Sequence, residues 1–351
     1  MRFSIDIDSG DAISGWLAPD NPSVSPRVTV VVPGRTDVEI DGTVIRRDVV
    51  DAGYHVTGIC GFLVTADMVP DLPQLMDIEI REAETRLPIY RRFAPDRDLR
   101  KKLFFFDCSV LPQRRLLNRI GSRFSLTYHN TERNGAETTL ATIVNPGAQS
   151  AFFWGRSHVL RYDEALTDHG FLRAAMLRDP FEELAERLYF LNYLAQEGGD
   201  APADYAHGLR SLLDFASDLP FKDPRGVAAA FRAASETQRR ELMSPMTRVF
   251  GCEVDEPPRH ANVTRALQKL AGFDVVGLRE KFPMFRDLIA GVLGEDVVED
   301  EEPVGYRAIR TLANTLSGIG MVNDLLAEDL ALYAYVTDAI DEGLAESVVA
   351  A

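Results

Sequence analysis

The strongest candidate for a functional site is the segment Met176–Pro180 (MLRDP), in which an arginine is followed directly by an aspartate and a proline. The apolar residues before it predict a strand, and Pro180 suits the first turn of a helix. Ligands of open parallel sheets bind beyond the carboxyl ends of the strands, and a guanidinium there grips a phosphate through two parallel hydrogen bonds. We therefore predict that Arg178 binds an anion. The alternative is that Arg178 pairs with Asp179 and orders the turn.

A polar loop with the sequence NTERNGAE precedes a predicted helix and is a second candidate site. Free backbone N–H groups at the N-terminus of a helix, together with the helix dipole, attract an anion. A glycine lets the backbone approach a phosphate, an arginine adds a permanent charge, and threonines cap the helix or donate to phosphate oxygens. An ordinary capped loop is the alternative, and the Walker A pattern GxxxxGK[ST] is absent. The predicted contacts are Arg133, Asn134, Gly135, Thr138 and Thr139.

A histidine in the segment Trp154–His158 (WGRSH) follows another predicted strand. Histidine titrates near neutral pH and is the commonest general base. We expect His158 to lie in the same layer at the strand ends as Arg178, where it is a candidate base. A purely structural role is the alternative.

Strands that alternate with helices are needed to position these residues. The alternation predicts right-handed βαβ units, a parallel sheet flanked by helices and an α/β fold class. The chain after about residue 203 is expected to be mostly helical. The strands are predicted at residues 123–129, 150–154 and 171–177, and the helices at 138–144, 162–169 and 180–195.

Short runs rich in β-branched residues occupy the first ninety-odd residues and predict a small all-β sandwich. Within the run Val38–Ile45, the pair Asp41–Gly42 predicts a hairpin. A charged, proline-containing stretch (APDRDLRKK) follows and is typical of a linker. The predicted organisation is a β-sandwich at residues 1–95, a linker at 96–121 and an α/β domain at 122–351.

Composition narrows the classes of function. The formal net charge of −16 argues against a general nucleic-acid binder, because such a protein needs a basic face for the phosphates. The cysteines Cys60, Cys108 and Cys252 are odd in number and far apart, so we expect buried free thiols without disulfides or a metal centre. The first ten residues (MRFSIDIDSG) contain neither the basic nor the apolar region of a signal peptide, so we expect no leader sequence, and no uncharged apolar run of about 18 residues occurs. We therefore expect a cytoplasmic protein without a transmembrane segment; the sequence does not indicate an oligomeric state.

Three segments, taken in order, resemble the sulfotransferases that use 3′-phosphoadenosine 5′-phosphosulfate (PAPS) as donor, in particular those that act on carbohydrates. These segments are His129–Leu140 (HNTERNGAETTL), Gly155–His158 (GRSH) and Leu177–Tyr189 (LRDPFEELAERLY). The run Asn323–Tyr333 (NDLLAEDLALY) is similar to the closing helix of that family. The resemblance spans about residues 123–340.

The resemblance implies a P-loop-like sulfotransferase fold and the transfer of a sulfuryl group from PAPS, without a metal, to a hydroxyl of a saccharide or related acceptor. It implies that Arg133 holds the 5′-phosphosulfate and that Arg178 binds the 3′-phosphate. A general base, with His158 as the candidate, takes the proton of the acceptor. A cation at the loop stabilises the leaving phosphate.

The chain departs from the pattern of that family in three respects. The loop lysine is absent, and Arg133 stands near its place although a guanidinium cannot give up its proton. Ala136–Glu137 replaces a glycine pair, and Glu186 replaces the serine eight residues after the arginine. Both glutamates bring negative charge near a proposed anion site. A non-catalytic relative that binds a nucleotide or glycan, or that serves as an assembly partner, is therefore the alternative function.

In the predicted β domain, the pairs Gly15–Trp16 and Gly61–Phe62 and the segment Arg47–Val49 (RDV) loosely resemble small β domains of bacterial polysaccharide-related transferases. Trp16, Tyr54 and Phe62 are able to stack on sugar rings, and packing in the core is the alternative role of these aromatic residues.

Overall fold

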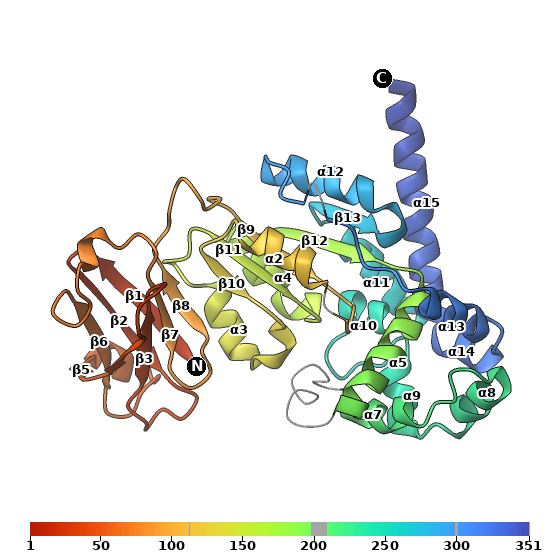
Figure 1. Ribbon diagram of the computed structural model, residues 1–351, viewed down its shortest axis with the longest axis horizontal. Helices are drawn as coiled ribbons and strands as arrows, with labels where there is room; N and C mark the ends of the chain where they lie inside the picture. The colour runs from red at the N-terminus through yellow and green to blue at the C-terminus, as the bar shows by residue number, and fades with distance from the viewer. Residues whose placement is uncertain (112, 198–208, 299–300, 351) are drawn as a thin grey trace. The chain divides into compact units, whose positions relative to one another are not determined.

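A computed structural model describes residues 1–111, 113–197, 209–298 and 301–350 of the chain. The chain divides into two compact units. The first unit comprises residues 1–104, 119–153 and 164–172, and the second comprises 105–118, 154–163 and 173–351. Figure 1 shows the elements in chain order.

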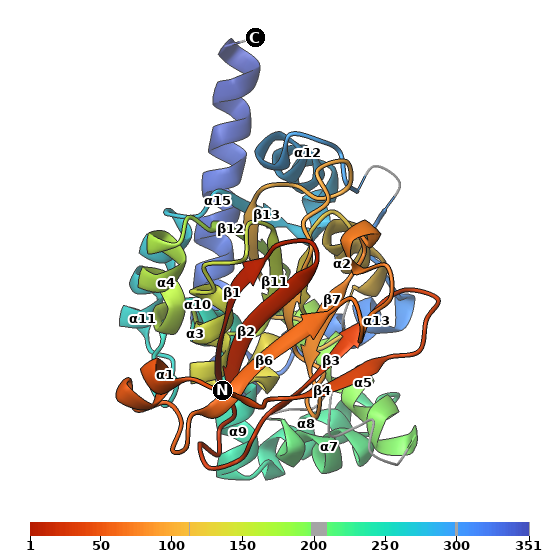
Figure 2. The same ribbon diagram turned by 90° about the vertical axis from the view of Figure 1, so that its left-hand side faces the viewer.

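Two four-stranded antiparallel sheets form the beginning of the first unit (Figure 2), as predicted for the first ninety residues. One sheet has the order β1-β2-β6-β5 and the other the order β4-β3-β7-β8. The sheets contact each other through β1 and β8 and through β4 and β6. Their strands are β1 (Arg2–Asp8), β2 (Ala12–Ala18), β3 (Arg27–Val31), β4 (Val38–Asp41), β5 (Val44–Ile45), β6 (Ile59–Thr65), β7 (Glu79–Glu82) and β8 (Pro88–Arg91), with the short helices α1 (Arg47–Asp51) and η1 (Leu72–Gln74).

The predicted hairpin at Asp41–Gly42 is wrong. β4 pairs with β3 and β5 pairs with β6, so the chain passes from one sheet to the other between them. The Gly42 N–H donates a hydrogen bond to the Pro26 carbonyl at 2.7 Å, and a Cβ atom on Gly42 would lie 2.8 Å from the Pro26 ring. Glycine is needed here for a close backbone approach and not for a hairpin turn.

A five-stranded parallel sheet with the order β10-β11-β9-β12-β13 confirms the α/β class. Its middle strand lies within residues 96–121, which the sequence analysis assigned to a linker, so the sheet begins before residue 122. The apolar run LFFF of this strand is typical of a strand that is buried on both faces. The strands are β9 (Lys102–Phe106), β10 (Leu126–Tyr128), β11 (Ala151–Gly155), β12 (Leu172–Leu177) and β13 (Val275–Leu278).

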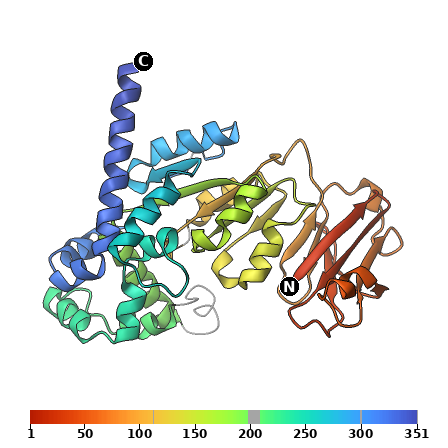
Figure 3. The same ribbon diagram turned by 180° about the vertical axis from the view of Figure 1, so that it is seen from behind.

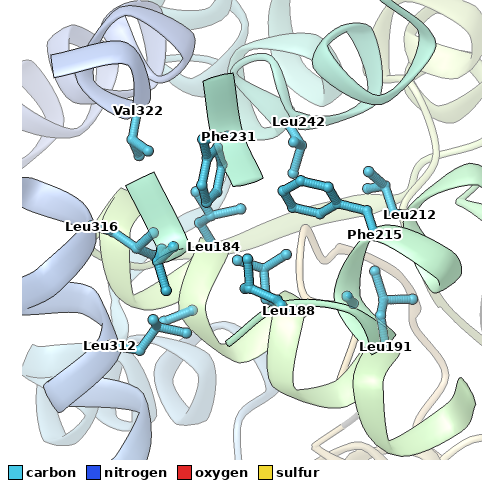
Figure 4. Packing of buried hydrophobic residues seen from close by; sticks show 14 of the residues in the cluster. Leu184, Leu188, Leu191, Leu212, Phe215, Phe231, Leu242, Leu312, Leu316 and Val322 are labelled. Carbon is cyan, nitrogen blue, oxygen red and sulfur yellow. The ribbon is translucent and has the colours of Figure 1, made fainter. Parts of the chain in front are cut away.

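Helices connect these strands and cover the rest of the second unit. α5 contacts both α7 and α13 (Figures 1 and 3). Leu184, Leu188 and Leu191 of α5 lie at the centre of a large apolar core, which Figure 4 shows. The helices are α2 (Arg114–Gly121), η2 (Thr131–Arg133), α3 (Ala136–Ile143), α4 (Val159–Asp168), α5 (Pro180–Glu197), α7 (Arg210–Ser217), α8 (Pro224–Ala233), α9 (Glu236–Leu242), α10 (Pro245–Gly251), α11 (His260–Leu270), η3 (Arg279–Lys281), α12 (Phe282–Leu293), α13 (Arg307–Ser317), α14 (Gly320–Leu325) and α15 (Ala327–Ala350).

The packing of α10 on α11 depends on Gly251, because a Cβ atom there would lie 2.2 Å from the Asn262 carbonyl oxygen. Alanine at this position would overpack the contact, so we expect Gly251→Ala to lower the free energy of unfolding by roughly 1–3 kcal/mol or more. Urea denaturation measures this change. Gly291→Ala in α12 is the control, since nothing lies within 4 Å of its Cβ position; alanine should raise stability there by up to about 1 kcal/mol. Similar effects of the two substitutions would contradict the close approach of α10 and α11.

Candidate functional site

The strand order creates a topological switch point beside β9. The chain runs from β9 to the edge strand β10, returns to β11, and then crosses to β12 on the other side of β9. Ligands of open α/β sheets bind outside the carboxyl ends of the strands at such a point. The segment after β9 begins with Asp107, and the segment after β12 begins with Arg178. Both segments belong to the second unit.

Arg178 lies where the sequence predicted, directly after β12 and before α5. Its Nε and Nη2 donate hydrogen bonds to Glu182 at 3.2 and 3.0 Å, and its Nη1 lies 2.5 Å from the Glu186 carboxylate. Arg279, directly after β13, donates to the other oxygen of Glu186 at 3.1 Å. Burial raises the pKa of Glu186, and the Arg279 charge opposes that shift. Two guanidiniums from neighbouring strands therefore share one buried carboxylate. Among the described residues, no ion pair joins Arg178 to Asp179, the alternative considered above; the Asp179 carboxylate instead accepts hydrogen bonds from the Phe181 and Glu182 N–H groups.

A cavity of about 490 Å³ adjoins this cluster, and its size is typical of a small-ligand site. The cavity lies beside the segment after β13 and the residues that precede α13. Its lining carries arginine and glutamate side chains, so an anionic ligand would be attracted by the guanidiniums and would compete with the carboxylates for them. The charged residues are Arg178, Arg279, Arg310, Glu182, Glu280 and Glu302.

Two further pockets share Tyr306 with this cavity. One, of about 350 Å³, is lined by Gln113, Arg114 and Arg115 at the start of α2, and the Gln113 side chain accepts a hydrogen bond from the Val304 N–H at 3.1 Å. The other, of about 390 Å³, is largely aromatic. The three pockets together offer guanidiniums and flat ring faces, which suits a ligand with anionic groups and a planar ring. The aromatic residues of the second pocket are Tyr189, Phe190, Tyr193 and Tyr306.

A layer of buried charge lies behind the segment that follows β9. The Asp107 carboxylate accepts a hydrogen bond from the Ser109 N–H at 2.8 Å, and the Ser109 hydroxyl donates to Glu183 at 3.3 Å. Burial raises the pKa of Asp107 to about 7, and the nearby charge of Glu183 adds to that shift. Arg187 donates to the Cys108 carbonyl at 3.1 Å. These contacts hold the segment after β9 against α5.

His158 is half-buried and follows β11 in the second unit. Its Nδ1 lies 3.2 Å from the Cys252 carbonyl oxygen, so Nδ1 carries the proton and Nε2 is the basic nitrogen. Burial lowers the pKa of His158, which keeps the imidazole neutral at pH 7. His158 is therefore chemically able to accept a proton, although it does not line the three pockets above.

The predicted loop residues Arg133, Asn134, Gly135, Thr138 and Thr139 all belong to the first unit, after the edge strand β10. Thr138 and Thr139 are buried. The Thr138 hydroxyl accepts a hydrogen bond from the Met1 nitrogen at 3.1 Å, and the Thr139 hydroxyl donates to the Thr131 carbonyl at 3.5 Å. Gly135 is the N-cap of α3, as a backbone anion site requires. The two threonine hydroxyls are thus already used inside the first unit.

Asp107 and Arg279 were not candidates in the sequence analysis. Each directly follows a strand that was not predicted from the sequence, namely β9 and β13. The signals were the apolar runs LFFF and VVGL, which are compatible with short buried strands. Once strands are assigned to these runs, both charged residues fall at strand ends.

A comparison with protein-family models and with curated proteins finds no match to this chain. Within the described residues, no helix is both long and apolar enough to cross a membrane. Over the same residues, no three histidine, cysteine, aspartate or glutamate side chains gather closely enough to hold a metal ion.

The buried carboxyl of Asp107 predicts a pH dependence of stability. Its pKa is raised from 3.8 to about 7 on folding, so the folded state binds this proton more tightly, and the contribution to stability is lost as the pH rises from about 4 to 7. Asp107→Asn keeps the oxygen that accepts from Ser109 and cannot ionise. We expect thermal unfolding to show that the variant gains stability relative to the wild type between pH 5 and pH 8. Parallel curves for the two proteins would show that Asp107 does not titrate in this range.

Proposed function

We propose that the second unit binds PAPS and transfers its sulfuryl group to a hydroxyl of a saccharide or related acceptor. The observation that carries this proposal is the convergence of Arg178 and Arg279 on one buried carboxylate beside a 490 Å³ cavity. Two guanidiniums that grip one planar anion are also suited to grip a phosphate. The resemblance around LRDP supports the same assignment for Arg178.

In this proposal the 3′-phosphate binds at Arg178 and Arg279, and the adenine ring rests on the aromatic pocket that includes Tyr306. The 5′-phosphosulfate lies at the segment after β9, where Arg114 and Arg115 begin α2. The switch point favours this segment over the loop at Arg133, because β10 is an edge strand. The loop at Arg133 is the alternative location.

The transfer itself requires a nucleophile, a leaving group and a base. The acceptor oxygen forms a bond to sulfur while the bond between sulfur and the bridging phosphate oxygen breaks. Guanidiniums at the start of α2 would stabilise the charge on the leaving phosphate. His158 is the proposed base for the acceptor proton, because its imidazole is neutral and its Nε2 is unprotonated.

A non-catalytic relative is the second candidate function, and Glu186 favours it. This carboxylate already occupies both guanidiniums and is 2% exposed. A protein that keeps the fold but no longer binds the nucleotide would hold its arginines in this way. The two functions differ in whether an anion can displace or neutralise Glu186.

Replacement of Arg178 tests the donor site. Charge-assisted hydrogen bonds contribute roughly 1.5–3 kcal/mol, so Arg178→Ala should weaken the binding of adenosine 3′,5′-bisphosphate about ten- to a hundredfold in calorimetry. Arg178→Lys should restore part of the affinity, because lysine keeps the charge and loses the planar fork. Adenosine 5′-monophosphate, which lacks the 3′-phosphate, should bind both the wild type and Arg178→Ala with nearly equal affinity.

Paired variants locate the 5′-phosphosulfate. If the segment after β9 holds the 5′-phosphate, Arg115→Ala should weaken the binding of adenosine 3′,5′-bisphosphate, and Arg133→Ala should have little effect on that binding. The reverse result would move the donor to the loop after β10. If the wild type binds neither nucleotide, the sulfotransferase assignment fails and the non-catalytic function replaces it.

Glu186→Gln tests the competition inside the site. The amide keeps the size of the side chain and removes its charge, so Arg178 and Arg279 become available to a phosphate. We expect this variant to bind adenosine 3′,5′-bisphosphate about tenfold more tightly than the wild type, or a gain of about 1.4 kcal/mol. Glu182→Gln, next to the same arginine, is the matched control and should have a smaller effect because it leaves the shared carboxylate in place. Weaker binding by Glu186→Gln in a folded protein would show that Glu186 positions the arginines for the ligand.

A further inference from the structure

A pocket of about 370 Å³ lies in the first unit, where α3 contacts β1. Its wall includes Arg2, Trp16 and Tyr54 from the antiparallel sheet region and Leu140 and Val144 from α3. None of these residues belongs to the second unit, which carries the proposed donor site. The pocket is therefore a separate candidate for ligand binding.

The aromatic part of the pocket is open to solvent. The rings of Trp16 and Tyr54 are nearly parallel, with an angle of 15° and centroids 6.3 Å apart. Tyr54, Leu140 and Val144 are 37%, 39% and 37% exposed, so apolar surface gathers here without a cover. Phe62, the third aromatic residue that was predicted to stack on a sugar or to pack in the core, is 2% exposed and belongs to the core.

The polar part of the pocket carries one charge of each sign. The Arg2 guanidinium lies 4.3 Å from the centroid of the Tyr54 ring, and Glu137 stands on α3. Within the described residues, no ion pair joins Arg2 or Glu137 to another side chain. Both groups are therefore available to a ligand, and together they favour one that is neutral and that both donates and accepts hydrogen bonds.

We propose that this pocket binds a neutral saccharide. A pyranose ring presents an apolar face of C–H groups, which matches the surface of Trp16 and Tyr54, and its hydroxyls donate to Glu137 and accept from Arg2. A volume of about 370 Å³ lies in the range of small-ligand sites. This binding does not depend on the function proposed for the second unit.

The chain has two tryptophans, Trp16 and Trp154, and Trp154 is 6% exposed. In the full-length Trp154→Phe protein, the fluorescence therefore reports on Trp16 alone. We expect at least one of the neutral tetrasaccharides of glucose, mannose, galactose and N-acetylglucosamine to cause a saturable change. Tyr54→Ala and Glu137→Gln should each weaken that binding about tenfold or more.

Ile45→Ala is the matched control, because Ile45 is 65% exposed on β5 and does not line the pocket; it should leave the affinity unchanged. Calorimetry on the wild type repeats the titration without the Trp154 substitution. The proposal is overturned if none of the saccharides binds, or if Ile45→Ala weakens binding as much as Tyr54→Ala does. Binding of adenosine or guanosine with the same dependence on Tyr54, in place of the saccharides, would assign the pocket to a nucleobase.

Discussion

Glu186 lies between the guanidiniums of Arg178 and Arg279 with 2% of its side chain exposed. A carboxylate at that depth must be neutralised where it lies, and removal of one partner from a buried ion pair typically costs about 3–5 kcal/mol. The cluster joins α5 to the ends of β12 and β13. Arg279 also donates to the Val304 carbonyl at 2.7 Å, so the segment before α13 is attached to the same group. The walls of the 490 Å³ cavity thus depend on one shared charge.

The helix that carries Glu186 has two tasks, which its sequence distributes over its faces. Leu184, Leu188 and Leu191 pack into the apolar core, while Glu183 and Glu186 face buried cations. Side chains three or four residues apart share a face of a helix, so the leucines form one face and the two glutamates another. Burial of the leucines fixes the position of the helix and thereby the positions of the two carboxylates. The free-energy cost of burying the charged carboxylates is offset by the apolar packing of the leucines on the same helix.

The sequence allowed the α/β class and the place of Arg178 to be predicted, because strand and helix periods alternate clearly from residue 123 onward and Pro180 marks a helix start. The prediction of buried free thiols is also confirmed by Cys60, Cys108 and Cys252. The strand β9 was missed because a run of four apolar residues has no period of its own, and its charged neighbours resembled a linker. The proximity of Arg178 and Arg279 could not be predicted from local sequence patterns, because it depends on which strands are neighbours in the sheet.

The two units are interleaved along the chain, since each is assembled from three separate stretches of sequence. A single cut therefore cannot separate the two units, because a fragment that keeps all of one unit also carries stretches of the other. A truncated protein that ends near residue 104 or begins near residue 173 would lack stretches that complete its own unit, and their loss would leave backbone groups without partners. For protein engineering, the two units must accordingly be grafted or expressed together.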